Sequence, residues 1–283
     1  MLEDKPYISS DKKITIEKNK ENSTNDSSIV YKIIAEINDY KYEGTTSNHL
    51  KRNGYGLNKF STGDLYLGNW KEDEKDGYGL LITYKDNKNL EIFLGNWKAG
   101  KKKYGFYLWG TKEGSVIDEK SYDCFFGNFE DDKYKYGLYC TSSGEKISYY
   151  IGNFEKSHER TSDINKSDLN GFFYSEQENK IFQGNFENDH LKEGNIYFLT
   201  ENKAARCKFN QHGDIQESEL LKMESQDIKI AFNEAITKNN RLKDINFKAI
   251  ISDLNKYLND VSLNSCLNKL EEKLEKLIPE ANK

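Results

Sequence analysis

The sequence contains little proline, with Pro6 and Pro279 the only examples among 283 residues. Proline interrupts both strands and helices, so no strand or helix between Pro6 and Pro279 is interrupted by a proline. Long apolar runs are missing as well, and no stretch reaches the roughly 20 residues that a transmembrane helix requires. The N-terminal residues 1–28 are polar, carry no signal-like apolar segment, and are expected to form a disordered tail.

Cysteine is scarce and its spacing is uninformative. Cys124, Cys140, Cys207 and Cys266 form no closely spaced pairs, which indicates reduced thiols rather than a zinc site or a disulfide framework. The four histidines are far apart in the sequence, and neither a Gly-x-Ser-x-Gly elbow nor a His-Glu-x-x-His motif is present. We therefore expect no catalytic residue, no metal site and no cofactor, and predict that the protein is not an enzyme.

An excess of positive charge is also missing. The chain carries 42 basic and 47 acidic residues, a net charge of -5, which argues against a nucleic-acid partner. One basic run stands out, formed by Lys98, Lys101, Lys102 and Lys103. It is interpreted either as a solvated turn or as a loop that contacts anionic phospholipid.

Aromatic residues, by contrast, are abundant and periodic. The pentapeptide aromatic, any residue, glycine, asparagine, aromatic occurs five times, with central glycines about 25 to 32 residues apart, and a weaker copy runs from Tyr42 to Gly44. Such a period is typical of repeat proteins, in which each unit contacts only its neighbours. The residues that define the five copies are Tyr66, Gly68 and Trp70; Phe93, Gly95 and Trp97; Phe125, Gly127 and Phe129; Tyr150, Gly152 and Phe154; and Phe182, Gly184 and Phe186.

The spacing within one copy predicts a β-strand. Side chains at i, i+2 and i+4 of a strand share a face, so Tyr66, Gly68 and Trp70 should point the same way. We expect an aromatic ring of a neighbouring strand to cover the glycine between them. A second glycine and aromatic cluster follows each copy, as in Gly77-Tyr78-Gly79, which predicts a hairpin. Polar insertions at about 111–121 and 157–168 are expected to protrude as loops.

The pattern Tyr66-Leu67-Gly68-Asn69-Trp70 followed by Gly77-Tyr78-Gly79 resembles the MORN repeat (membrane occupation and recognition nexus). The resemblance covers roughly residues 40–210, with Phe in place of Trp at positions 129, 154 and 186. It implies an elongated, single-layer antiparallel sheet of stacked hairpins, and a short protein of the kind that lacks an enzyme domain.

The chain changes character near residue 214, after which glycine disappears and the apolar period becomes helical. About three helices are expected there, the last carrying an interaction seam formed by Leu263, Leu267, Leu270, Leu274 and Leu277. The predicted fold is thus a mainly β MORN-like array at 29–213 followed by an α-helical region at 214–283. The helices can form their own bundle, cap the end of the sheet, or pair with another chain, for example as a homodimer.

Two functions follow from this organisation. The resemblance implies a scaffold that binds other proteins of a cytoskeletal assembly, such as a ciliary axoneme with its radial spokes or the membrane skeleton of the cell cortex. The expected location is cytoplasmic and associated with the cytoskeleton. The alternative is a peripheral membrane adaptor that binds anionic phospholipids through loops of the sheet, beginning with the run at Lys98.

Overall fold

The computed structural model describes about three fifths of the chain. The described residues are 8–9, 12–18, 31–37, 40–47, 49, 51–85, 89–113, 116–143, 146–155, 159–161, 171–187, 190–201, 203–210 and 214–221. Within them the chain forms eighteen strands and no helix. The chain divides into two compact units, Met1–Tyr107 and Leu108–Lys283, a division that falls inside the repeat segment predicted at 29–213.

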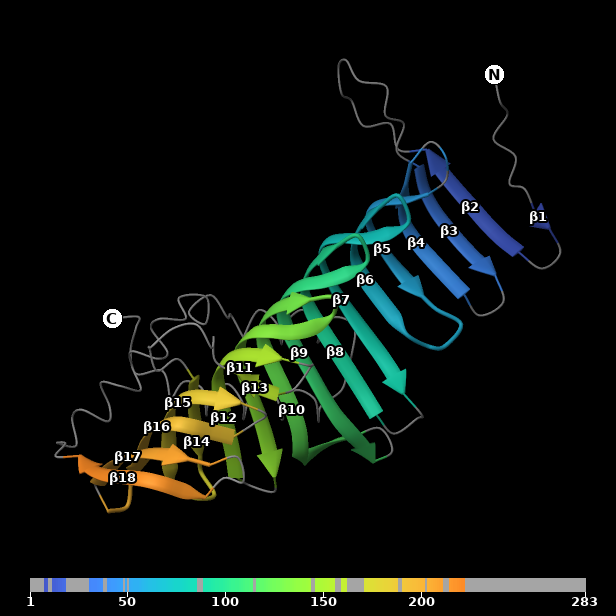
Figure 1. The fold of residues 1–283 in the computed structure, drawn as a ribbon. Helices are drawn as coiled ribbons and strands as arrows, with labels where there is room; N and C mark the ends of the chain where they lie inside the picture. The colour runs from blue at the N-terminus through green and yellow to red at the C-terminus, as the bar shows by residue number, and fades with distance from the viewer. Residues whose placement is uncertain are drawn as a thin grey trace, which may run out of the picture. The chain divides into compact units, whose positions relative to one another are not determined.

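Strands of the first unit follow one another in chain order (Figure 1). They are β1 (Ile8–Ser9), β2 (Lys12–Lys18), β3 (Tyr31–Ile37), β4 (Tyr40–Thr46), β5 (Arg52–Lys59), β6 (Leu65–Lys71), β7 (Glu74–Lys85), β8 (Asn89–Lys98) and β9 (Lys101–Glu113), of which β9 ends in the second unit. Each pairs with its neighbour, and every pairing whose register is resolved is antiparallel. Within the segment 1–28, where a disordered tail was expected, residues 8–9 and 12–18 form β1 and β2, and β2 pairs with β3.

The second unit continues the same antiparallel scheme. Its strands are β10 (Val116–Glu130), β11 (Lys133–Ser143), β12 (Lys146–Glu155), β13 (Glu159–Thr161), β14 (Gly171–Ser175), β15 (Lys180–Glu187), β16 (His190–Phe198), β17 (Lys203–Phe209) and β18 (Ile215–Leu221). Strand β12 pairs with both β13 and β14.

Three expectations about loops and helices need correction. The insertion at 111–121 lengthens the arms of the β9–β10 hairpin instead of protruding, and the insertion at 157–168 contains β13, which pairs with β12. Residues 215–221, placed in the helical region, form β18 because β17 offers an open edge. The remainder of the predicted helical region lies outside the described residues.

Tight turns join the two strands of each central repeat. Glu72 and Asp73 connect β6 to β7, Ala99 and Gly100 connect β8 to β9, and all four residues have positive φ angles. Asp131 and Asp132 do the same between β10 and β11. Positive φ at both central positions is the signature of a type I′ turn, which matches the right-handed twist of paired strands. Acidic residues hold this conformation in two of the three turns, although glycine and asparagine adopt it at lower cost.

Glycines of successive strands lie directly opposite one another. In the first unit the cross-strand partners form one line: Gly44, Gly56, Gly68, Gly79 and Gly95. In the second unit Gly127 pairs with Gly137 and Gly137 with Gly152, while Gly184 pairs with both Gly171 and Gly194. A Cβ atom on Gly68 would collide with the Cα atom of Gly79. These lines therefore mark where neighbouring backbones approach too closely for any side chain.

In four of the five copies the central glycine is covered by the first ring of its own strand, which corrects the expectation of a ring from a neighbouring strand. Tyr66 is fully buried, and its ring lies over both Gly68 and Gly79. Its edge meets Trp70 at 4.8 Å and Trp97 of the next repeat at 5.7 Å between ring centroids. Edge-to-face contacts of this kind add to the free energy gained from burial alone, so the rings connect each repeat to the next.

The second unit repeats this packing until its last copy. Phe125 contacts Phe129 and Phe154, and Tyr150 contacts Phe154 and Phe186, all edge to face at 5.1 to 5.5 Å. Phe182, the equivalent ring of the last copy, is only half-buried and stacks on Phe173 instead. Leu191 approaches Gly184 where the earlier copies place a ring.

Part of the opposite face of the strands is buried as well. On β7 and β8, Leu80, Ile82, Ile92 and Leu94 are 0 to 4% exposed, although they alternate with the residues that face the rings. On these two strands, aromatic side chains are therefore buried on one face and aliphatic side chains on the other.

Candidate interaction surface

Among the described residues, no group of three or more His, Cys, Asp or Glu side chains is placed to hold a metal ion. Over the same part of the chain, no helix has the length and apolar character needed to cross a membrane. The features with functional interest are instead the exposed side chains that recur from repeat to repeat.

A tyrosine precedes the second glycine of each of three successive repeats in the first unit. These residues, here called the tyrosine row, are Tyr55 on β5, Tyr78 on β7 and Tyr104 on β9. Tyr55 is 55% exposed and Tyr78 is 48% exposed, whereas Tyr104 is half-buried. Tyr55 and Tyr78 are unusual because large aromatic side chains elsewhere in the described chain are mostly buried.

Asparagines of the repeated pentapeptide alternate with the tyrosine row. Asn69 is the cross-strand partner of Tyr55, and Asn96 is the partner of Tyr78. The Asn69 side-chain amide donates a hydrogen bond to the carbonyl oxygen of Tyr78 (3.2 Å), which holds it against the next strand. Tyrosines two strands apart are separated by about 9.5 Å, twice the strand spacing. The result is a regular ladder of rings and amides on the first unit.

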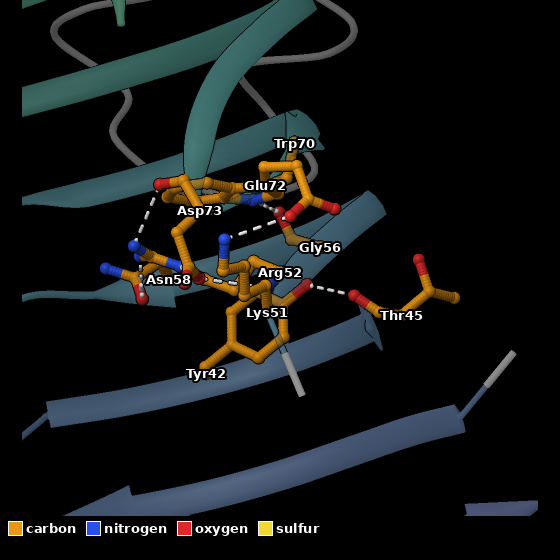
Figure 2. A network of polar contacts seen from close by, with 9 residues as sticks. All are labelled: Tyr42, Thr45, Lys51, Arg52, Gly56, Asn58, Trp70, Glu72 and Asp73. Carbon is orange, nitrogen blue, oxygen red and sulfur yellow. Dashed lines mark hydrogen bonds and ion pairs between the residues drawn. The ribbon is translucent and has the colours of Figure 1, made fainter. Parts of the chain in front are cut away.

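Arg52 fixes the turn at the edge of this ladder (Figure 2). Its backbone N–H and its Nε both donate to Oδ1 of Asp73 (2.9 and 3.0 Å), and its terminal guanidinium group donates to the Asp73 carbonyl oxygen (3.0 Å). The backbone N–H of Asp73 donates in return to the carbonyl of Arg52 (3.1 Å). Arg52 and Asp73 are here called the turn clamp. It stabilises a turn whose φ angles are otherwise unfavourable.

The guanidinium group of Arg52 also lies 4.0 Å from the centroid of the Trp70 ring, a cation–π contact. Trp70 in turn donates from Nε1 to the carbonyl oxygen of Gly56 (3.3 Å), a contact drawn in Figure 2. Burial alone would raise the pKa of Asp73, but the hydrogen bonds and the positive charge of Arg52 outweigh it and lower the pKa. The turn carboxylate therefore stays ionised.

The next repeat builds a similar turn from different residues. Asp76 accepts hydrogen bonds from the Lys98 ammonium group (3.4 Å) and from the backbone N–H of Ala99 (3.3 Å). The backbone N–H of Gly100 donates to the carbonyl of Lys75 (3.0 Å), whose ammonium group lies 4.6 Å from the centroid of Trp97. A cation over the second aromatic residue of the copy is thus common to both turns.

The four lysines of the basic run around Lys98 differ in their contacts and in their exposure. Lys98 forms an ion pair with Asp76 (3.2 Å), and the Lys102 ammonium group lies 5.8 Å from the ring centroid of Phe93 and 5.4 Å from that of Tyr107. Lys101 and Lys103 are exposed. Only the turn residues Ala99 and Gly100 separate β8 from β9, so the lysines belong to strands rather than to a loop. Lys98 and Lys102 are therefore committed to contacts within the first unit.

One recurring position escaped the sequence analysis. In three copies the residue five places after the second aromatic pairs with that aromatic across the strand pair, and it contacts the first ring of the copy or the glycine beside it. These residues are Lys75, Tyr134 and Leu191; Lys102 has the same offset from Trp97 and lies over Phe93, whereas Phe154 pairs with Arg160 instead. Tyr134, for example, stacks on Phe125 with centroids 4.1 Å apart. The constant offset was visible in the sequence, but the dissimilar side chains concealed its significance.

The predicted leucine seam from Leu263 to Leu277 lies outside the described residues. The repeat-defining aromatics do come together within each unit, as described above, with Phe182 as the exception. No protein-family model matches this chain, and no curated protein matches it either. The stacked antiparallel hairpins are compatible with the resemblance to MORN repeats.

Proposed function

We propose that the protein is a MORN-like, non-enzymatic scaffold that binds other proteins through the tyrosine row of its first unit. The observation that carries this proposal is the exposure of Tyr55 and Tyr78, two strands apart, on a sheet whose other large rings are mostly buried. Tyrosine is enriched at protein interfaces because its ring supplies contact area while its hydroxyl group stays hydrated.

The repeat architecture supports the same function. Each packed ring, glycine line and turn clamp serves to hold the backbone in a regular array, and the array places Tyr55 and Tyr78 at a constant spacing. A rigid array lowers the entropy lost when a partner binds. The partners that we propose are proteins of a cytoplasmic cytoskeletal assembly, such as a ciliary axoneme with its radial spokes or a cortical membrane skeleton.

Localisation in living cells tests the proposal. The tagged wild-type protein should concentrate on a cytoskeletal structure, and a Tyr55→Ser, Tyr78→Ser double variant should become diffuse while keeping its unfolding temperature. Leu220→Ser is the matched control, because Leu220 is 78% exposed on β18 of the other unit. A double variant that localises like the wild type would show that the tyrosine row is not the docking surface.

A peripheral membrane adaptor is the second candidate, and exposed Lys101 and Lys103 favour it. A lysine near an anionic surface contributes about 1 kcal/mol, so two lysines alone give weak attachment. Sedimentation with phosphatidylserine vesicles at low salt tests this function directly. Loss of vesicle binding in a Lys101→Gln, Lys103→Gln variant would favour the adaptor function. If the wild type does not bind the vesicles, the adaptor function is excluded and the scaffold function remains as the proposal.

A further inference from the structure

Two cysteines that are distant in the sequence are neighbours in the second unit. Cys124 on β10 and Cys140 on β11 are direct cross-strand partners in the antiparallel pair. Both side chains are buried, at 3% and 1% exposure, and both are free thiols. We propose that Cys124 and Cys140 are a site of reversible oxidation, at which a hydroperoxide converts the two thiols into a cross-strand disulfide.

The backbone geometry suits such a bond. Directly opposed residues of an antiparallel pair have Cα atoms about 4.5 or 5.5 Å apart, and disulfides span Cα separations of about 4.4 to 6.8 Å. The register is firmly set, because Gly127 lies opposite Gly137 three residues farther along the same pair of strands. The register set by the paired glycines thus also places the two cysteines opposite each other.

The chemistry balances with a hydroperoxide as the only oxidant. One cysteine, as thiolate, attacks an oxygen of hydrogen peroxide; the O–O bond breaks, a sulfenic acid forms, and the hydroxide that leaves takes up a proton to become water. The second thiolate attacks the sulfenic sulfur, the S–S bond forms, and the S–O bond breaks to release a second water. Two thiols lose two electrons, and hydrogen peroxide is reduced to two molecules of water.

Burial makes the pair slow to react at neutral pH. The hydrogen bond with Cys140 and the buried position raise the pKa of the Cys124 thiol, which keeps it protonated. The thiolate is the reactive form, so oxidation should accelerate as the pH rises. A disulfide here closes the hairpin that turns at Asp131 and Asp132, and would resist opening of β10 from β11.

Cys207 provides a matched control. It is also a buried free thiol of the second unit, and its cross-strand partners Gly194 and Ser218 carry no sulfur. Cys207 therefore shows how a buried thiol reacts with peroxide when no cysteine lies opposite it. If the pairing matters, Cys124 and Cys140 should form a disulfide and Cys207 should not.

The experiment treats the full-length protein with hydrogen peroxide, blocks remaining thiols with an alkylating agent in denaturant, and maps peptides without reduction. We expect one intramolecular link, between the peptides that contain Cys124 and Cys140, in the wild type and in Cys207→Ser. The link should form faster at pH 9 than at pH 7, disappear with dithiothreitol, and raise the unfolding temperature by at least about 5 °C.

Cys124→Ser and Cys140→Ser should each lose the link. If either variant fails to fold, peptide mapping of the wild type alone decides. Full alkylation of Cys124 and Cys140 after peroxide treatment would overturn the proposal, as would a link to Cys207 or between chains. This inference stands independently of the proposed scaffold function, because it uses neither the tyrosine row nor any partner.

Discussion

The hydroxyl group of Tyr66 donates a hydrogen bond to the backbone carbonyl of Asn69 (3.0 Å), three residues farther along the same strand. The bond holds the ring flat over Gly68 and Gly79. Tyr42 and Tyr150 make the same contact with Thr45 and Asn153 in their own repeats. Burial, together with the nearby Asp76 carboxylate and Tyr55, raises the pKa of Tyr66, so the hydroxyl group remains a donor.

Replacing Tyr66 should separate the contribution of the ring from that of the hydroxyl group. Phe93 and Phe125 occupy the equivalent position without a hydroxyl group, so Tyr66→Phe should cost at most about 1 kcal/mol of unfolding free energy. Tyr66→Ala empties the space over two glycines and should cost about 3 to 5 kcal/mol. Urea denaturation measures both, and equal costs would mean that the hydrogen bond, not the ring, holds the repeat together.

A side chain on the glycine line should be destabilising. A Cβ atom at Gly127 would collide with the backbone carbonyl of Tyr136, the Cα atom of Gly137 and the ring of Phe125. Because backbone atoms cannot move aside easily, Gly127→Val should cost about 1 to 3 kcal/mol. Gly100→Asn is the control, since Gly100 has open space around it and asparagine tolerates its φ of 75°. Comparable melting temperatures for the two variants would refute the clash.

Much of the fold could be predicted from the sequence because the repeat signal depends on local geometry. The spacing of Tyr66, Gly68 and Trp70 fixes which side chains share a face, and the second glycine cluster fixes the hairpin. The ring that covers Gly68 could not be assigned in this way, since both the same strand and its neighbour present aromatics at suitable positions. β18 was missed because apolar residues such as Leu220 and Leu221 fit a helical period as well as a strand.

The tyrosine row and the cysteine pair could not be predicted from the sequence for a different reason, which is that both depend on how the strands are paired. Tyr55 and Tyr78 were read as parts of a glycine cluster, and their exposure depends on a strand geometry that leaves them opposite the ring-bearing face. Cys124 and Cys140 were judged by their separation along the chain. Counting outward from the paired glycines Gly127 and Gly137 would have placed them opposite each other, so the signal was present once the register was known.

The turn clamp should depend on the forked shape of arginine as well as on its charge. Arg52→Ala removes two side-chain donors to Asp73 and the contact with Trp70, and should cost about 1 to 3 kcal/mol. The backbone donor persists in every variant. Arg52→Lys keeps the charge but not the planar fork, so its cost should be intermediate. A lysine variant as stable as the wild type, measured by thermal unfolding, would show that charge alone suffices.

Acid should weaken the same clamp. The pKa of Asp73 is lower in the folded protein than its ordinary value of 3.8, so ionised Asp73 favours the folded state above that pH. The contribution is lost as the pH falls through the lower, folded-state pKa. The difference in urea midpoint between wild type and Asp73→Asn should therefore shrink from pH 6 to pH 2. A difference that is constant over this range would mean that the Asp73 carboxylate contributes nothing as a charge.

Truncation after β17 and after β18 should have different consequences. β18 pairs with β17 from Ala204 to Phe209, and Ala204 and Cys207 on β17 are buried. A chain ending at residue 213 lacks β18 and leaves the edge of β17 unpaired, which invites association between sheet edges. A chain ending at residue 221 keeps the pairing but removes the leucines from Leu263 to Leu277 with the rest of the predicted helical region.

We expect the 213 truncation to aggregate and to unfold at a lower temperature. If the removed helical region covers the sheet in the same chain, the 221 truncation should also lose stability. If the region instead binds another chain, that truncation should stay soluble and keep its unfolding temperature while losing its dimer or its partner. Light scattering and thermal unfolding of both chains beside the full-length protein distinguish these outcomes. A 213 truncation that is as soluble and stable as the full chain would show that β18 does not protect the edge.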